Sequence, residues 1–338
     1  MTGQIAIIGL GQIGASVGMA LKRNKSSLQR LGFDKDTAVS SAALTLDVVD
    51  QVPRRLADTV RDADIILLCL PLGEVPLVLK QIASLLKENA VVMDTGPLKG
   101  STVKLMQDLL PAERYYVGLV PAVSAEALTD PETGFKGARP DLFKRTVMIV
   151  DVLHGAPAEV EQLAVNFAKL VGAKPMIADL AESDGMMTIA HILPQLTAAA
   201  LLGATVDQPG WADGRKLAGR PFVSVTGGMA YYDDPASLQA AALANQTGMV
   251  HALDVLMASL RGLRDDIEHG DQDSLRERLQ MAFEARERWL DERGAADWLS
   301  EGGEAPELPE VGEQLTQMFF GSRLADRMKK SKEKGKKN

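Results

Sequence analysis

The sequence holds little of what disulfide-bonded or metal-binding proteins need. Its 338 residues include one cysteine and four histidines. A single cysteine excludes an internal disulfide, and we expect Cys69, within the apolar run Ile65–Leu70, to pack inertly in a core strand of a cytoplasmic protein. The histidines lie far apart, and neither H-x-x-x-H nor C-x-x-C occurs, so we predict no metal site.

Long hydrophobic runs and basic charge are also scarce. No apolar run reaches the ~20 residues that span a bilayer, and Met1 almost directly precedes the first predicted strand. We therefore expect no membrane segment and no signal peptide. The net charge is −8, although the last ten residues, 329–338, carry +5, which leaves −13 on the remainder. An acidic body argues against nucleic acid as a ligand, and we expect the basic tail to be disordered, with a weak anionic-surface contact as the alternative.

The N-terminal sequence carries the most specific pattern. The apolar run Ile5–Ile8 leads into a G-x-G-x-x-G turn at Gly9, Gly11 and Gly14, and Asp34 lies 20 residues beyond Gly14. A strand, a glycine turn, a helix and a second strand ending in an acid predict dinucleotide binding. We assign the three glycines to the tight turn, the close approach of the pyrophosphate and helix packing, respectively. The alternative is a glycine-rich turn without a ligand.

Asp34 indicates which dinucleotide binds. Its carboxylate can accept hydrogen bonds from both ribose hydroxyls and repels a 2′-phosphate. Lys35 partly offsets that repulsion, but Asp36 follows it, so we favour NAD over NADP. The candidate cofactor-binding residues are Gly9, Gly11, Gln12, Ile13, Gly14, Asp34, Leu70, Pro71 and Asp94.

The pattern of elements predicts two domains. Continuous apolar strands alternate with helical segments in the first half, which is typical of a parallel sheet covered on both faces. We predict an α/β, doubly wound Rossmann domain over residues 1–172 and an all-α domain over residues 173–298. Residues 299–338 are expected to form an acidic linker, a short helix and the basic tail. The predicted strands are Ile5–Leu10, Leu28–Asp34, Ile65–Leu70, Ala90–Asp94, Tyr116–Val120 and Thr146–Val150, with Pro175–Ala178 as a possible last strand.

The second half is predicted to be helical throughout. Three long segments, Asp184–Val206, Pro235–His269 and Asp273–Arg293, have helical patterns, and Pro194 should kink the first. Their sustained apolar faces need a large packing partner. We therefore expect a homodimer formed through the helical domain.

Five segments together resemble the prephenate/arogenate dehydrogenase family. They cover about residues 4–290, and no single one is sufficient. The segments are Gly9–Ser16 (similar to G-x-G-x-I-G-x-S), Asp94–Gly100 (D-x-G-S-V-K-G), Val120–Glu126 (H-P-x-A-G-x-E), Ala190–Leu196 (S-H-L-P-H-L) and Thr226–Asn245 (T-R-I-A, then D-P and a helix bearing Asn).

The resemblance implies NAD(P)-dependent oxidative decarboxylation of prephenate or arogenate on the way to tyrosine. The substrate side departs from the family pattern. Val120 stands where the family has its catalytic His, and Pro97 stands where it has Ser. The family's substrate-binding Arg falls at Gly227 or Gly228, and its second His at Gln195. An acidic E-H-D triplet reads Glu182-Ser183-Asp184.

These departures matter for the chemistry. Oxidising a hydroxyl needs a base for its proton, and Val120 cannot serve as one. Prephenate is a dianion, yet no Lys or Arg occurs between Arg220 and Arg261. Cations would have to come from Lys99, Arg215 or a partner subunit.

Three candidate catalytic residues remain. His191 is either an acid/base and hydrogen bonder or a satisfied core histidine. Lys99 is either a buried lysine with a lowered pKa or a helix-start lysine in solvent. Glu126 either orients the substrate or is an exposed loop acid. We therefore predict an NAD-dependent dehydrogenase of the prephenate type. The alternatives are a related dehydrogenase for a less anionic substrate and a non-catalytic NAD-binding sensor or partner protein.

Overall fold

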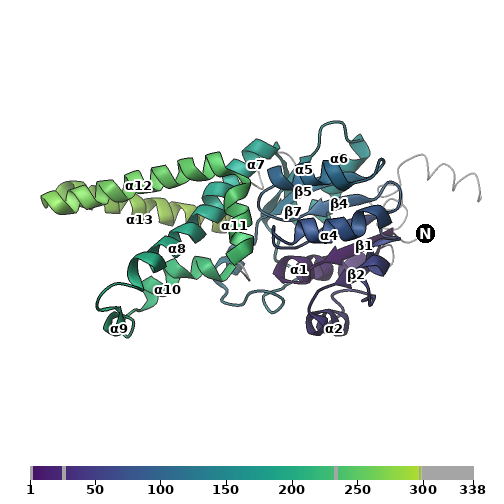
Figure 1. Cartoon of the computed structure of the whole chain (residues 1–338), viewed down its shortest axis with the longest axis horizontal. Coiled ribbons are helices and arrows are strands. Elements are labelled where there is room, and N and C mark those ends of the chain that lie inside the picture. Colours follow the sequence, from purple (N-terminus) through teal and green to yellow (C-terminus); the bar gives the residue numbers. More distant parts are fainter. Residues whose placement is uncertain (1–2, 25–27, 232–234, 297, 299–338) are drawn as a thin grey trace, which may run out of the picture.

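The computed structural model of the chain describes residues 3–24, 28–231, 235–296 and 298. A helix-covered sheet forms one part of the molecule, and a bundle of helices extends away from it to form the other (Figure 1). The predicted acidic linker, short helix and tail at 299–338 lie outside the described residues.

The sheet has seven strands in the order β2-β1-β3-β4-β5-β6-β7. β1 therefore lies between β2 and β3, and the chain changes direction across the sheet there, at the kind of switch point where α/β folds bind ligands. The strands are β1 (Gly3–Ile8), β2 (Leu28–Phe33), β3 (Ile65–Leu68), β4 (Val91–Asp94), β5 (Tyr115–Pro121), β6 (Thr146–Val152) and β7 (Ala173–Ile177).

The doubly wound class is confirmed, with one correction to the expected parallel pairing. β6 runs antiparallel to β5, whereas the other neighbours are parallel. A parallel neighbour needs a crossover, usually a helix, but the segment between β5 and β6 holds only turns and the short 3-10 helix η3 (Ala125–Thr129). β7 belongs to the same sheet, so the sheet extends to Ile177, five residues past the boundary expected at 172.

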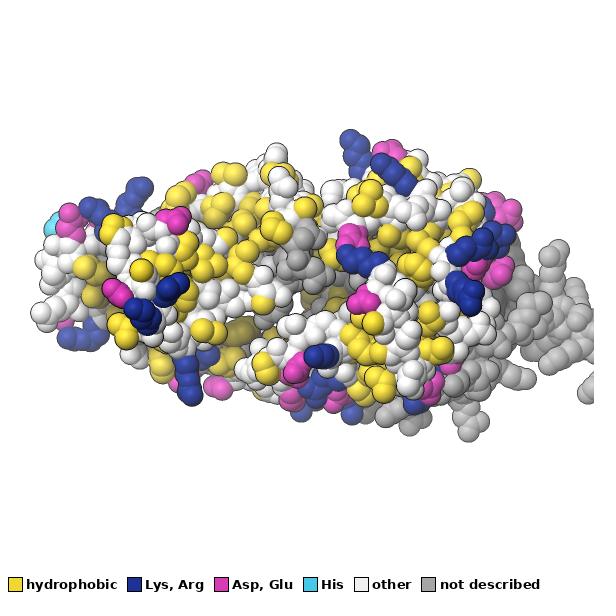
Figure 2. Space-filling model, turned by 60° about the horizontal axis from the view of Figure 1, so that its bottom comes forward, with side chains coloured by type: hydrophobic (Ala, Val, Ile, Leu, Met, Phe, Trp, Pro, Cys, Tyr) yellow, Lys and Arg dark blue, Asp and Glu magenta, His cyan; other side chains and the backbone are white. Residues whose placement is uncertain are grey.

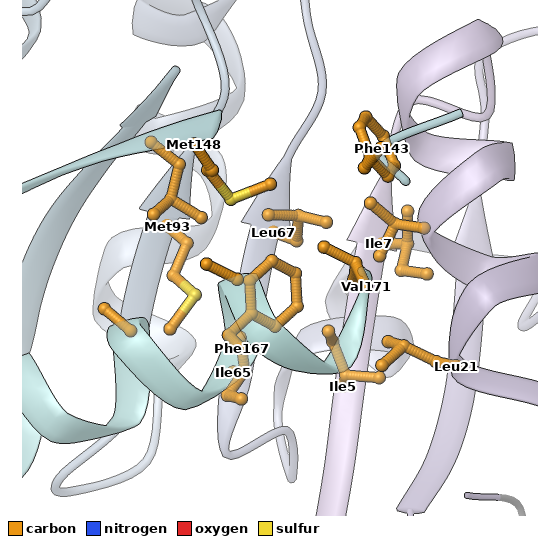
Figure 3. Close-up of a cluster of buried hydrophobic side chains, with 14 of the residues drawn as sticks. Ile5, Ile7, Leu21, Ile65, Leu67, Met93, Phe143, Met148, Phe167 and Val171 are labelled. Carbon is orange, nitrogen blue, oxygen red and sulfur yellow. The ribbon is translucent and has the colours of Figure 1, made fainter. Parts of the chain in front are cut away.

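Side chains of the central strands alternate between two hydrophobic cores. Ile5 and Ile7 of β1 face a core that includes Phe167, whereas Ala6 and Ile8 face the opposite core. Figure 3 shows the first core, beneath α1 and α6. The helices of this part are α1 (Gln12–Ala20), α2 (Thr37–Thr45), α3 (Leu56–Val60), α4 (Val75–Ile82), α5 (Gly100–Leu109) and α6 (Ala158–Leu170), with 3-10 turns η1 (Leu21–Asn24) and η2 (Ala83–Leu85).

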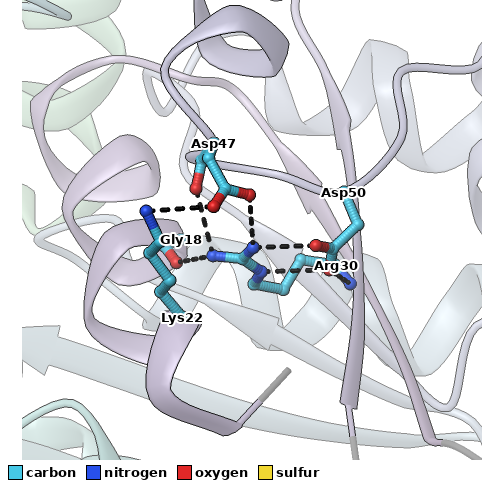
Figure 4. A network of polar contacts seen from close by, with 5 residues as sticks. All are labelled: Gly18, Lys22, Arg30, Asp47 and Asp50. Carbon is cyan, nitrogen blue, oxygen red and sulfur yellow. Dashed lines mark hydrogen bonds and ion pairs between the residues drawn. The ribbon is translucent and has the colours of Figure 1, made fainter. Parts of the chain in front are cut away.

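A buried arginine joins β2 to its neighbours, a feature that the sequence did not suggest. Arg30 is fully buried, and its guanidinium donates to Asp50 at 2.8 and 3.1 Å, to Asp47 at 3.2 Å and to the Gly18 carbonyl at 2.8 Å (Figure 4). Lys22 pairs with Asp47 from the other side. Two carboxylates and a carbonyl offset the desolvation of the guanidinium, so the network ties α1 to β2.

The helical part begins with one long, interrupted helix. α7 (Leu180–Met187) passes into a π-helical turn, η4 (Thr188–Ile192), and then into α8 (Leu193–Thr205). Pro194 has no N–H to donate to the preceding turn, and the Leu193 N–H bonds instead to the Thr188 carbonyl, five residues back. The kink expected at Pro194 stays a prediction, and a π-turn lies directly before this residue.

Within the described part of the chain, one helical stretch, Leu180–Thr205, is long and apolar enough by length and composition to cross a membrane. By this criterion, the expectation that no segment is long and apolar enough to span a bilayer is wrong. The finding is weak evidence of a span, because core helices pass the same test. Here the stretch packs against α10 (Arg220–Thr226), α11 (Pro235–Ala244) and α12 (Gln246–His269), and 22% of its apolar window is buried.

The predicted long helix Pro235–His269 is in fact two helices. Asn245 ends the first, and its side-chain oxygen accepts from the Gly248 N–H at 3.2 Å, which caps the second. The remaining helices are α9 (Trp211–Gly214), α10 (Arg220–Thr226), the 3-10 turn η5 (Gly227–Tyr231), α11 (Pro235–Ala244), α12 (Gln246–His269) and α13 (Gln272–Ala295).

α12 and α13 form a hairpin that projects away from the sheet (Figure 1). Large apolar side chains on it are exposed, and Figure 2 shows hydrophobic side chains spread over the helical part. Such a surface fits the expected packing against another subunit. The exposed apolar residues of the hairpin are Val250, Val255, Met257, Leu260, Ile267, Leu279, Met281, Phe283 and Trp289.

Candidate functional site

The glycine turn between β1 and α1 has the geometry that nucleotide binding requires. Gly9 has φ +89°, and a Cβ there would lie 2.3 Å from the Cys69 carbonyl oxygen. A Cβ on Gly14 would lie 2.0 Å from the Gly9 carbonyl oxygen, whereas one on Gly11 would meet no atom within 4 Å. Gly9 and Gly14 are thus required by the protein's own packing. Gly11 leaves bare backbone facing open space, as a pyrophosphate contact needs.

The N-terminus of α1 is available to an anion. Gly11 precedes the helix and has no side chain that could cap its first N–H groups. The Gly11 carbonyl accepts a hydrogen bond from the Ala15 N–H. The Gln12 side chain donates to the Gly137 carbonyl at 3.0 Å and so ties the loop before β6 to this helix. The helix dipole and uncapped N–H groups near Gln12 and Ile13 suit a phosphate.

Asp34 is hydrogen-bonded to the same turn. One carboxylate oxygen accepts from the Leu10 N–H at 2.8 Å, and the other accepts from the Asp36 N–H at 2.9 Å. This places the acid at the end of β2 beside the glycine turn, with lone pairs left for ribose hydroxyls. The neighbouring Lys35 forms an ion pair with Glu74, which directly precedes α4.

The end of β3 borders the turn on its other side. Leu70 packs close to Gly9, and a Cβ on Gly9 would lie 3.1 Å from its side chain. Leu70 and Pro71 are both partly exposed there. Burial raises the pKa of the Cys69 thiol to about 12, so this sulfur stays protonated. No group of three His, Cys, Asp or Glu side chains is placed for a metal ion among the residues described.

Asp94 and Lys99 form a fully buried pair at the end of β4. Lys99 Nζ donates to the Asp94 carbonyl at 2.7 Å and to its carboxylate at 3.0 Å. That carboxylate also accepts from the Gly96 N–H at 2.8 Å and from the Tyr116 hydroxyl at 3.3 Å. Gly118 of β5 leaves space for the lysine stem, since a Cβ there would lie 3.0 Å from Lys99 Cδ.

Lys99 is therefore not a helix-start lysine in solvent. Burial lowers the pKa of Lys99, although Asp94 opposes that shift. The Lys99 ammonium and the Asp94 carboxylate are both fully buried. Their hydrogen bonds therefore stabilise the conformation of the loop between β4 and α5, and neither group lies on the surface of that loop. Direct contact of either residue with cofactor or substrate stays a prediction.

A third hydrophobic cluster joins the two parts of the molecule. Leu72 and Leu98, from the loops after β3 and β4, pack with Ile192, Leu238 and Met249 of the helical part. These loops lie at the carboxyl edge of the sheet, where such folds bind ligands. The junction therefore brings the π-turn beside the cofactor edge.

His191 lies on this π-turn, next to Ile192. It is partly exposed, and burial lowers its pKa, so the imidazole is neutral near pH 7. The Gln195 side chain donates to the His191 carbonyl at 2.8 Å. π-turns interrupt α-helices frequently at functional sites, which fits the candidate role of His191.

Glu126 lies in η3, after β5, and is exposed. The pKa of its carboxyl is lowered, chiefly by its own backbone N–H, and Arg139 and Arg145 lower it further. It is not part of the buried group around Lys99. Val120, where the family has its His, is buried within β5.

Arg293 is a site candidate that sequence reasoning missed. From the end of α13 it donates to the Val123 carbonyl, in the loop after β5, and its guanidinium lies 5.6 Å from the Trp298 ring. Burial lowers its pKa. No ion pair of Arg293 occurs within the described ranges. No local sequence signal marks this residue, because 170 positions separate it from the loop it contacts.

The switch point and the glycine turn with its acid define a dinucleotide-binding fold, and a helical part packs against its carboxyl edge. Comparisons with known proteins agree with this class. The profile of the prephenate dehydrogenase nucleotide-binding domain matches residues 17–177. The chain is 28% identical to cyclohexadienyl dehydrogenase of Zymomonas mobilis over 289 residues, 83% of this chain and 94% of that protein. Residues 17–177, just under half of the chain, thus match the nucleotide-binding domain of prephenate dehydrogenases.

Two further similarities agree with this placement. Prephenate dehydrogenase of Bacillus subtilis is 24% identical over 61% of this chain and 54% of that protein. Prephenate dehydrogenase from A. aeolicus, solved in complex with hydroxyphenyl propionate and NAD+, superimposes with a TM-score of 0.73 at 21% identity. That superposition covers 85% of this chain and 98% of the other, and it shows a shared fold.

Proposed function

We propose that the chain is an NAD-dependent dehydrogenase that oxidatively decarboxylates prephenate or arogenate in tyrosine biosynthesis. The observation that carries this proposal is the junction at which Leu72 and Leu98 pack on Ile192. This junction supports a place for neutral His191, the neighbour of Ile192, near the carboxyl edge of the sheet. The match to the prephenate dehydrogenase nucleotide-binding domain and the name of the Zymomonas mobilis relative support a cyclohexadienyl substrate.

The residues at this edge fit NAD. Gly11 and the start of α1 would hold the pyrophosphate, and Asp34 would accept from the adenosine ribose. Glu74 engages Lys35, the cation closest in sequence to Asp34, which supports NAD over NADP. NAD supplies the hydride acceptor when it is bound.

We infer that His191 takes the proton of the substrate hydroxyl. Its lowered pKa keeps the imidazole neutral, the form that accepts a proton. Lys99 would hold the loop after β4 through Asp94, and Glu126 would orient the substrate from the loop after β5. Arg293 is the cation that we propose for a substrate carboxylate, because it lies at that same loop.

We further propose a cytoplasmic homodimer. The exposed apolar side chains of the hairpin support it. Arg215, a cation considered for the substrate, follows α9, which lies at the end of the helical part away from the sheet (Figure 1). Within one subunit it is remote from the cofactor edge, so it would serve a site only across a subunit interface.

Substitutions at the substrate side favour a second candidate: a dehydrogenase for a less anionic compound. Gly228 packs against α8, and a Cβ there would lie 3.3 Å from the Pro194 carbonyl oxygen, whereas one on Gly227 would meet no atom within 4 Å; neither glycine supplies the cation of the family pattern. Pro97 and Val120 likewise contribute no polar group. If the absence of these polar groups abolishes turnover altogether, the third candidate function is that of a non-catalytic NAD-binding protein.

The test is NADH formation from NAD with prephenate, and with arogenate in parallel. We expect turnover, and we expect His191→Asn to lower kcat by about 10²–10⁴-fold while NAD affinity stays within twofold. Unchanged kcat in His191→Asn would remove this residue from the mechanism. Tight NAD binding without turnover of either compound would favour the other candidates.

A further inference from the structure

Asp184 links the two parts of the molecule by hydrogen bonds. It lies on α7, in the helical part, but its carboxylate accepts from the Lys99 N–H at 2.6 Å and from the Gly100 N–H at 3.0 Å, at the start of α5. The residue is buried, with 8% of its surface exposed. A carboxylate at a helix N-terminus is favourable, so this contact holds α7 to the loop after β4.

The hydrogen bonds continue from Asp184 into the π-turn. The Asp184 carbonyl accepts from Thr188 Oγ1 at 2.7 Å, and Thr188 Oγ1 accepts from Asn245 Nδ2 at 3.0 Å. Asn245 is also the residue that caps α12. Thr188 begins the π-turn that carries His191. One continuous set of contacts therefore connects the loop after β4, the π-turn and the start of α12.

We propose that Asp184 is a positioning residue for the reaction: it sets where His191 stands relative to the loop Asp94–Lys99. This inference rests on the proposed function. Proton and hydride transfer need reacting atoms about 3–3.5 Å apart, and a 1 Å misplacement costs on the order of 10²-fold in rate. Asp184 is the charged residue of α7 that bonds directly to that loop. Its loss should therefore make the position of His191 less well defined without removing a group that takes part in the reaction.

The alternative is that Asp184 merely caps a helix. Asp179 provides the matched control, because it caps α7 itself by accepting from the Glu182 N–H at 2.8 Å. Both Asp→Asn changes remove one charge and weaken one cap, at a cost of about 0.5–2 kcal/mol. Within the described part of the chain, Asp179 makes no hydrogen bond or ion pair with α5, so the two variants differ in the link between the parts.

The first measurement is amide hydrogen exchange of Asp184→Asn and Asp179→Asn in the full chain. We expect at least tenfold faster exchange in Asp184→Asn at Lys99 and Gly100 and across residues 188–192. In Asp179→Asn, faster exchange should be confined to the first turn of α7. Equal exchange at residues 188–192 in the two variants would overturn the inference.

The second measurement is turnover with NAD and prephenate, together with NAD affinity by calorimetry. Asp184→Asn should lower kcat by at least tenfold and raise the substrate deuterium isotope effect, with NAD affinity within twofold; Asp179→Asn should change neither. If Asp184→Asn does not fold, Asp184→Glu keeps the charge and shifts the carboxylate, and the same kcat loss is expected. Normal kcat in a folded variant refutes the inference. A wild-type protein without turnover refutes the proposed function, and exchange then decides the role of Asp184.

Discussion

The ion pair between Lys35 and Glu74 gives a quantitative prediction about cofactor choice. Lys35 follows Asp34 directly, and its ammonium is paired with a Glu74 carboxylate whose side chain is 25% exposed. We expect Glu74→Gln to release Lys35 toward a 2′-phosphate and to remove one negative charge from that edge. NADP should therefore bind more tightly, while NAD, which lacks this phosphate, should bind as before.

The magnitude follows from the exposure of the pair. The Lys35 side chain is 71% exposed, so breaking the pair costs at most about 1 kcal/mol. A released ammonium ~5 Å from a phosphate gains roughly 1 kcal/mol per charge in a solvent-rich setting. We expect NADP affinity to rise about 5–30-fold, and the gain to shrink at high salt because exposed charges are screened.

Titration calorimetry with NAD and NADP at low and high salt measures the effect. Lys35→Met is the control, since the gain from Glu74→Gln should shrink to the part caused by the lost Glu74 charge when Lys35 is already absent. An unchanged NADP affinity in Glu74→Gln would refute the reasoning. An equal gain in the double variant would show that Glu74 repels the phosphate without involving Lys35.

Three further predictions concern stability and substrate binding. Arg30→Met leaves the carboxylates of Asp47 and Asp50 without the arginine side chain that they accept hydrogen bonds from. The free energy of unfolding, measured in guanidinium chloride, should fall by about 3–5 kcal/mol, and a loss under ~1 kcal/mol would contradict the role of this network. Burial raises the pKa of Asp151 to about 6, above its value in the unfolded chain, so Asp151 favours folding at acid pH and this contribution is lost as pH rises through 6. The free energy of unfolding of Asp151→Asn relative to wild type should therefore increase by about 1–3 kcal/mol between pH 4 and pH 7, and a pH-independent difference in urea unfolding would argue against it. Arg293→Ala should raise the KM for prephenate about 10–100-fold with a smaller effect on kcat, as expected for loss of a charge-assisted hydrogen bond; an unchanged KM would place the substrate carboxylates elsewhere.

Local patterns predicted the parts of the fold that short-range physics decides. The glycine turn at Gly9 and the acid at Asp34 were visible because their spacing reflects one strand, one turn and one helix. The strand Ile65–Leu68 was visible because it is buried on both faces and therefore apolar at every position. The reversal of β6 was not, because strand direction depends on the connection and not on the strand's own residues.

Long-range contacts explain what the sequence left open. The sequence allowed Lys99 to be either buried or in solvent. The contact with Asp94, the neighbouring Tyr116 and the space at Gly118 place it in the interior. Nothing near Asp184 or Arg293 in sequence reveals that each bonds to a loop of the other domain. The cap at Asn245, in contrast, has a local signal: Asn is a preferred N-cap, and it divides the predicted helix there.

The π-turn has a consequence for the phase of the helix that contains it. A π-turn is equivalent to one extra residue in an α-helix, and one residue corresponds to a rotation of about 100°. α7 contacts the sheet domain through α5 and β6, whereas α8 contacts α10 and α12. The extra residue therefore lets a single helical rod present differently oriented faces to two neighbours. Deleting one residue from Thr188–Ile192 would rotate α8 out of register with α7, so a chain shorter by one residue would lose one of the two interfaces.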